Sequence, residues 1–151
     1  MGRLLSIVVI SCVTVCAGFA FEDPLNGDWK LASKTRAAAK GSATHSLRIE
    51  SDETKVLIVH KGINAAGQSV QWEIRGDFGK QIGILDVPEI DAVRCWRSDA
   101  RTILMKLFRE AVAVGYWTAE ASKNGKSLKV TSIALDSTGK EDKTIDVFER
   151  Q

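Results

Sequence analysis

Two histidines and one cysteine are the side chains of this sequence best suited to metal binding or nucleophilic chemistry. His45 and His60 lie in separate apolar segments, and neither has a glutamate at helical spacing. A zinc site needs three or four ligands, so both histidines and Cys95 would have to converge from distant segments. Arg94 and Trp96 flank Cys95. A neighbouring cation favours the reactive thiolate form of a cysteine. We favour the alternative, in which the thiol is buried as a small apolar group. We therefore expect ordinary strand histidines and no metal site.

Short matches to catalytic motifs lack the context that their chemistry requires. Asp77-Phe78-Gly79 matches the metal-binding tripeptide of protein kinases, but no catalytic loop precedes it. Gly125-Lys126-Ser127 matches the end of a phosphate-binding loop, but Glu120 stands where the first glycine is required. One segment gathers three carboxylates that could bind calcium, namely Asp86, Glu89 and Asp91. We favour the alternative that this segment is a solvated acidic loop. We expect no enzymatic activity and no cofactor.

A row of large apolar side chains beside one basic residue suggests a binding site for a small molecule. Period-2 alternation places these residues on common faces of their strands, and the wall would consist of Val70, Trp72, Ile74, Met105, Leu107 and Tyr116. If Glu110-Ala111 is a two-residue turn, Met105 faces Tyr116 and Arg109 faces Val112. Arg109 would then suit a carboxylate head group on an apolar tail. The alternative is that Arg109 lies at a solvated rim and the large residues fill a core.

Ten short segments with period-2 alternation must position these side chains. The expected strands are Gly27–Ala32, Thr44–Glu50, Lys55–Ile63, Ser69–Gly76, Lys80–Leu85, Ala92–Arg97, Thr102–Arg109, Ala113–Ala121, Ser127–Leu135 and Thr144–Arg150. Connections of two to five residues join only antiparallel neighbours, and closure of so many strands removes free edges. The sequence therefore predicts an all-β fold, an up-and-down antiparallel β-barrel of eight to ten strands. Ser33–Ala43 is the exception, either a short helix or a loop.

The N-terminus has the three parts of a secretory signal peptide. Arg3 supplies a positive charge, an apolar run follows from Leu4 to Val15, and Gly18-Phe19-Ala20 provides small residues for cleavage after Ala20. The run is too short to span a bilayer, which needs about 20 apolar residues. A lipid anchor on Cys12 is a less favoured alternative. We therefore expect residues 1–20 to be removed, residues 21–151 to form one domain, and the product to be periplasmic or secreted.

Composition narrows the possible partners. The 151 residues include 21 basic and 19 acidic side chains, dispersed along the chain, which gives no electrostatic footprint for nucleic acid. Cleavage of the signal peptide would leave Cys95 as the single cysteine, so no disulfide within the chain can form. The sequence leaves open the oligomeric state and whether Cys95 pairs between chains.

Both ends of the expected domain resemble one group of barrel proteins. Asn26-Gly27-Asp28-Trp29-Lys30-Leu31 resembles the Gly-x-Trp start shared by lipocalins and fatty-acid-binding proteins, and Asp146-Val147-Phe148-Glu149-Arg150 resembles the close of the fatty-acid-binding group. The meander between them is similar to small secreted bacterial lipocalin-like proteins. The resemblance covers residues 26–151. It implies that Trp29 plugs one end of the barrel, that Gly27 lets the backbone pass close under its ring, and that Arg150 lies across it.

The resemblance and the apolar wall together lead to one expected function. We expect non-catalytic binding of a small hydrophobic or amphipathic molecule inside the barrel of an exported protein. The alternative is a barrel filled by its own side chains, which acts through its surface or loops as an envelope-associated interaction or inhibitor protein.

Overall fold

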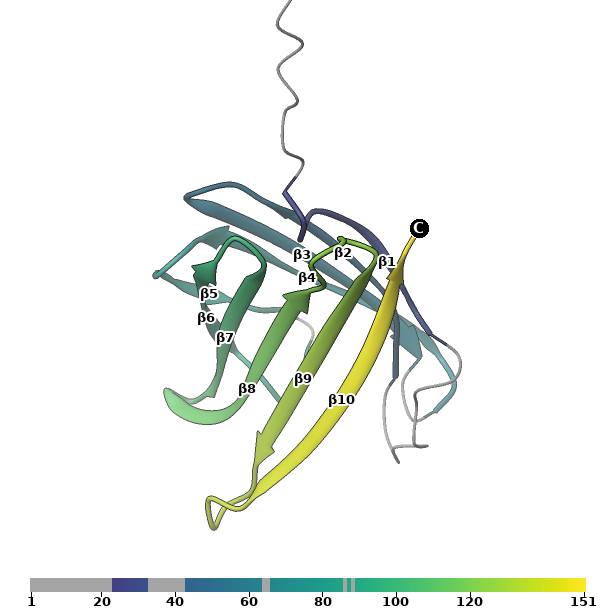
Figure 1. The fold of residues 1–151 in the computed structure, drawn as a ribbon. Coiled ribbons are helices and arrows are strands. Elements are labelled where there is room, and N and C mark those ends of the chain that lie inside the picture. Colours follow the sequence, from purple (N-terminus) through teal and green to yellow (C-terminus); the bar gives the residue numbers. More distant parts are fainter. Residues whose placement is uncertain (1–22, 33–42, 64–65, 86, 88) are drawn as a thin grey trace, which may run out of the picture.

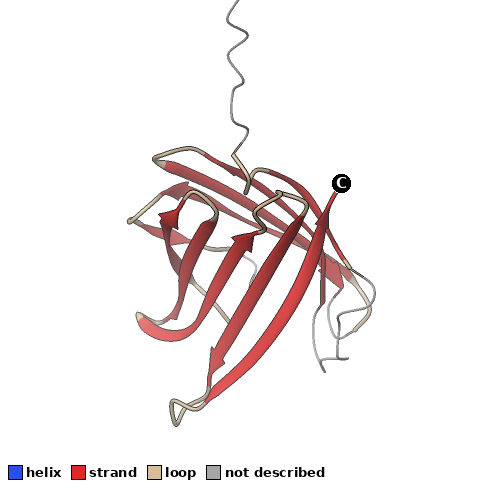
Figure 2. Ribbon diagram, viewed as in Figure 1, coloured by secondary structure: helices blue, strands red, loops and turns tan. Residues whose placement is uncertain are grey.

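Ten β-strands make up the regular structure in the described part of the chain (Figure 1, Figure 2). The computed structural model describes residues 23–32, 43–63, 66–85, 87 and 89–151. The strands are β1 (Gly27–Leu31), β2 (Ala43–Ser51), β3 (Lys55–Ile63), β4 (Ser69–Asp77), β5 (Gln81–Gly83), β6 (Ala92–Asp99), β7 (Thr102–Arg109), β8 (Val112–Ala121), β9 (Ser127–Leu135) and β10 (Glu141–Arg150). The expected signal peptide with Cys12, and all but the last residue of Ser33–Ala43, lie outside the described residues. Within them, no helix has the length and apolar character to cross a bilayer.

The strands form one antiparallel sheet that curls into a nearly closed barrel (Figure 1). The strand order is β4-β3-β2-β1-β10-β9-β8-β7-β6-β5. Strands that are consecutive in the sequence therefore pair with each other, except β4 and β5. β1 pairs with both β2 and β10, which joins the beginning of the domain to its end. The predicted up-and-down antiparallel barrel is therefore confirmed. Its closure is incomplete at one seam, between β4 and β5, where no ladder of hydrogen bonds joins the described residues.

One end of the barrel is sealed by Trp29, which is fully buried. Its indole Nε1 donates a hydrogen bond to the carbonyl of Leu25 over 3.0 Å. Arg150 pairs with Trp29 across β1 and β10, and its Cζ lies 4.4 Å from the ring centroid. The guanidinium also donates to the carbonyls of Gly125, Pro24 and Asn26. The side chain thus ties the end of β10 to the segment that precedes β1.

The same side chain explains why residue 27 is a glycine. Gly27 has a φ of +139°, which side chains rarely adopt. A Cβ atom at this position would lie 2.6 Å from Nη1 of Arg150. Any other residue would therefore displace the guanidinium from its three carbonyls.

Among the described residues, the inner face becomes more exposed toward the end opposite Trp29. On β9 the inner face runs from Leu128, which is buried, to Ala134, which is exposed. On β10 it runs from buried Phe148 to exposed Asp142. The half near Trp29 is therefore a packed apolar core, and the other half, the open end, gives access to the inner wall.

A β-bulge in β8 reverses part of the expected register. Glu110 and Ala111 do form a two-residue turn, with φ values of 50° and 65°, and Arg109 pairs with Val112 as expected. Beyond the turn, however, Phe108 pairs with Ala113 and Leu107 with Gly115, which leaves one extra residue in β8. An extra residue moves every following side chain to the other face.

The bulge therefore corrects one prediction. Met105 faces Trp117, and the prediction that it faces Tyr116 is wrong. Trp117 is 7% exposed and lies inside the barrel, whereas Tyr116 is 39% exposed and lies outside.

Candidate functional site

Three aromatic rings form a layer across the middle of the barrel. The imidazole of His60 on β3 stacks on the indole of Trp72 on β4, with ring centroids 3.6 Å apart and an interplanar angle of 6°. Trp117 meets His60 edge-on, with centroids 5.8 Å apart and an angle of 64°. In strand order β3 and β8 lie on opposite sides of the barrel, so Trp117 reaches across the interior. This aromatic layer, Trp72–His60–Trp117, separates the apolar core from part of the open end.

His60 is an unusual member of this layer because it is a buried polar residue whose ring nitrogens make no hydrogen bond to another described residue. The residue is 3% exposed, and neither Nδ1 nor Nε2 has a hydrogen-bond partner among the described residues. Burial disfavours the charged imidazolium and lowers the pKa of His60 from 6.5 to about 3. The ring is therefore neutral near pH 7, and its two unpartnered nitrogens lower the stability of the folded state.

A polar strip lies on the inner wall beside the aromatic layer. It consists of Ser132 on β9 and of Thr144 and Asp146 on β10, whose side chains share the inner face with Phe148. Thr144 pairs with Ser132, and Ser132 pairs with Trp117, which places the strip next to the layer.

The strip does not hold the fold together. None of its three side chains has a hydrogen bond or ion pair with another described residue, and Oδ1 of Asp146 is fully buried. Polar groups inside proteins are normally hydrogen-bonded. The strip therefore offers acceptors and hydroxyl groups that a bound molecule can satisfy.

The residues expected to form the binding wall are divided between core and open end. Ile74 and Met105 are buried in the packed core. Trp72, Val70 and Leu107 are partly buried on inner faces nearer the open end. The structure thus brings most of the expected wall to the interior and divides it between the packed core and the half nearer the open end.

Arg109 does not lie beside that wall as an interior charge. It shares the inward alternation of Met105 and Leu107 but is exposed at the last position of β7. This position matches the alternative of a solvated rim.

The sequence analysis missed the polar strip and Trp117. Counting by twos from the buried Phe148 would have placed Asp146 and Thr144 on the inner face. The face of Trp117 depends on the bulge in β8, for which the isolated Gly115 inside the strand was the available signal.

Cys95 and the histidines show no catalytic or metal-binding arrangement. Cys95 is fully buried, and burial raises the pKa of its thiol to about 12. Its thiolate is therefore scarce at neutral pH. His45 is exposed at the bulge of β2, two residues from Leu47, which pairs with the buried His60. No group of three histidine, cysteine or acidic side chains with metal-binding geometry occurs in the part of the chain that the structure describes.

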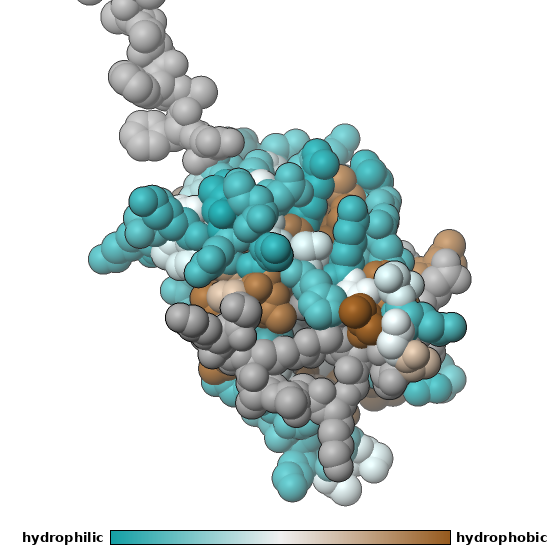
Figure 3. All heavy atoms as spheres, turned by 90° about the vertical axis from the view of Figure 1, so that its right-hand side faces the viewer, coloured by the Kyte–Doolittle hydropathy of each residue, from teal (hydrophilic) through white to brown (hydrophobic). Residues whose placement is uncertain are grey.

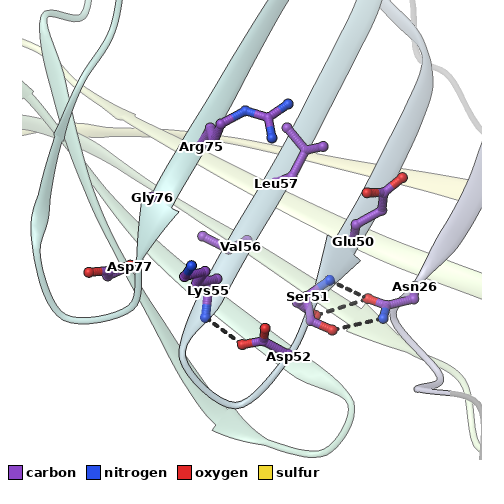
Figure 4. Close-up of a pocket in the computed structure, with 10 residues that line it drawn as sticks. All are labelled: Asn26, Glu50, Ser51, Asp52, Lys55, Val56, Leu57, Arg75, Gly76 and Asp77. Atoms are coloured by element: carbon purple, nitrogen blue, oxygen red, sulfur yellow. Dashed lines mark hydrogen bonds between the residues drawn. The ribbon is translucent and has the colours of Figure 1, made fainter.

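A groove of about 520 Å³ lies on the outside of the barrel near the β2–β3 turn (Figure 4). Asn26 closes one side, where its Nδ2 donates to the Ser51 carbonyl and its Oδ1 accepts from the Ser51 amide. On the turn itself, Oδ1 of Asp52 accepts from the Lys55 amide over 2.7 Å. These bonds hold the turn against the segment before β1, so the polar groups of the groove serve the fold.

The side of the molecule seen in Figure 3 is mostly hydrophilic, with separate hydrophobic patches. Charged pairs such as Arg48–Glu50 and Lys129–Glu120 are about half exposed and contribute little stability.

No family model matches the chain, and no curated protein matches it significantly. The functional assignment therefore depends on the barrel, its aromatic layer and its polar strip.

Proposed function

We propose that this protein is an exported, lipocalin-like barrel that binds a small, largely apolar molecule without catalysis. The polar strip carries the proposal. Ser132, Thr144 and Asp146 face the interior, have no partner among the described residues, and lie where the inner wall becomes accessible. A few polar groups in an otherwise apolar concave wall are typical of a small-molecule site.

The proposed site lies in the open half of the barrel, with the aromatic layer as its floor. Trp72 and Trp117 present apolar ring surface, and Leu107 and Val70 continue the wall toward the open end. The apolar body of the ligand packs on these residues, and its polar group contacts the strip. Export is supported by the signal-like pattern of residues 1–20.

A second candidate function has its own supporting observation. The aromatic layer fills the middle of the barrel with side chains. On the outside, exposed apolar residues cross several strands, namely Trp96, Leu104, Tyr116 and Ile145. A barrel of this kind would act through its outer face on another protein.

Probe binding to matched variants separates the two functions. We would express the full chain in a bacterial host, determine the mature N-terminus, and record native mass spectra before and after solvent extraction. The purified protein would then be titrated with N-phenyl-1-naphthylamine, with energy transfer from tryptophan as the signal. Ser132→Leu fills the inner wall, and Thr131→Leu changes the neighbouring outward position on the same strand.

The proposal predicts a co-purifying small molecule or saturable probe binding. Ser132→Leu should weaken that binding about tenfold or more, whereas Thr131→Leu should leave it within about twofold. Equal effects of the two variants would place the probe outside the barrel. A clean unliganded mass with no probe binding would refute the proposal and favour the surface function.

A further inference from the structure

We propose that the ligand of this barrel is a cationic amphiphile, whose protonated amine binds Asp146. This inference rests on the proposed binding function and specifies the chemical class of its ligand. It also reverses the polarity expected from the sequence, in which Arg109 was to receive a carboxylate.

Asp146 is a carboxylate that faces the interior without a cation. It lies at mid-length on the inner face of β10, two positions from the fully buried Phe148. Its Oδ1 is buried and has no hydrogen-bond partner among the described residues, and none of their basic side chains pairs with it. The residue as a whole is partly buried, and a buried polar oxygen is normally hydrogen-bonded in proteins. The site therefore lacks one cationic donor.

The other charges near the inner face are already used or lie outside it. Arg97 pairs with Asp23 over 2.6 Å at the Trp29 end. Arg150 is bound to three carbonyls at the same end. Arg109 and Asp142 are exposed at the open end. Among the described strands, no basic side chain is left on the inner wall to neutralise Asp146.

The surroundings of Asp146 suit an ammonium group and oppose a carboxylate. Thr144 is the next inward position on β10, and Ser132 pairs with it from β9, so two hydroxyl oxygens accompany the carboxylate. An ammonium group has three N–H donors and needs such acceptors. A carboxylate ligand would instead meet a like charge. His60 would not offset this repulsion, because it is neutral near pH 7.

The apolar tail of the ligand has a surface to pack against. Ser132 pairs with Trp117, whose ring belongs to the aromatic layer, so the strip and the layer adjoin. Asp146 itself pairs with Val130, one row nearer the Trp29 end than Ser132 and Trp117. A tail anchored at Asp146 therefore extends past Thr144 and Ser132, along the edge of the layer, toward the open end.

The test compares three eight-carbon probes that differ only in their polar group. Octylamine, octanol and octanoate would be titrated calorimetrically into the mature protein, or used to displace the naphthylamine probe. The variants are Asp146→Asn and Asp146→Ser. The matched control is Asp142→Asn, which removes a carboxylate from the same strand and face at an exposed position. Thermal unfolding of each variant checks that it is folded.

Octylamine should bind the wild type about tenfold or more tightly than octanoate, because its ammonium group forms charge-assisted hydrogen bonds with Asp146 whereas the octanoate carboxylate meets a like charge. Either Asp146 variant should abolish this preference, and Asp142→Asn should keep it. Equal or tighter binding of octanoate to the wild type would overturn the inference, as would a preference that survives in a folded Asp146 variant. If all three probes bind alike, the binding function stands and the ligand class is wrong. If neither the probes nor the naphthylamine bind, the binding function itself fails.

Discussion

Replacement of His60 by leucine should make the protein less sensitive to acid. In the folded state the imidazole is buried between two indoles and its pKa is about 3, whereas its ordinary pKa is 6.5. Between these two pH values the unfolded chain binds a proton that the folded chain does not. Acid therefore favours unfolding. The contribution of the neutral His60 ring to the free energy of unfolding is fully present above pH 6.5 and is lost as the pH falls toward 3.

The size of the effect follows from the width of this window. Each pH unit inside it changes the free energy of unfolding by about 1.4 kcal/mol through this single group. Between about pH 7 and about pH 4.5, the wild type should lose about 2 to 3 kcal/mol more than the His60→Leu variant. At neutral pH the variant should be the more stable protein by on the order of 1 kcal/mol, because two unpartnered nitrogens are removed and one ring stack is lost.

Urea titrations followed by tryptophan fluorescence at the two pH values measure this difference. Other groups also respond to acid: hydrogen bonds from neighbouring backbone and side-chain groups lower the pKa of Asp52, Asp99 and Asp136. These carboxyl groups lose their contribution as the pH falls through and below 3.8, but they do so in both proteins and cancel in the comparison. Parallel pH profiles for wild type and variant would refute the assignment of a buried neutral histidine.

Three further predictions concern the closed end, a turn and the thiol. Gly27→Ala should lower the free energy of unfolding by about 2 kcal/mol or more, because the new Cβ displaces Arg150; Gly83→Ala, where no atom lies within 4 Å, is the control for the same urea titration. Ala111→Gly should raise the free energy of unfolding by about 1 kcal/mol, and with it the melting temperature, since residue 111 has a φ of 65°. An unchanged melting temperature would contradict strain in this turn. Cys95 should resist iodoacetamide near neutral pH until urea unfolds the protein, and fast labelling of the native protein, read by mass spectrometry, would contradict its burial.

Much of the fold could be predicted because alternation and turn residues are local signals. Asn124-Gly125, for example, marks the β8–β9 turn, and Gly125 there has a φ of 67°. Short connections then left only antiparallel pairing between neighbours. The meeting of β1 with β10 was a further inference from strand number and resemblance, and it is confirmed.

The interior was predicted less well because it depends on properties that are not local. One extra residue in β8 moves Trp117 inward and Tyr116 outward. Gly115 lies at this bulge, and a glycine inside a strand can mark a bulge but does not fix which residue is the extra one. Asp146 alternates correctly with Phe148, yet a carboxylate gives no reason by itself to expect an inward direction. Similarly, the stacking of His60 on Trp72 requires the pairing of β3 with β4 in one particular register.

The barrel can widen most easily at the seam between β4 and β5. Elsewhere around the circumference, any widening would break rows of inter-strand hydrogen bonds, but at this seam no such ladder joins the described residues beyond the short turn from Asp77 to Gln81. A shallow groove of about 340 Å³ already straddles it, with Trp72 among its lining residues and the exposed Leu85 on the β5 side. The circumference can therefore grow and recover at low free energy beside the aromatic layer, and the β4 amides should exchange with deuterium before those of β9.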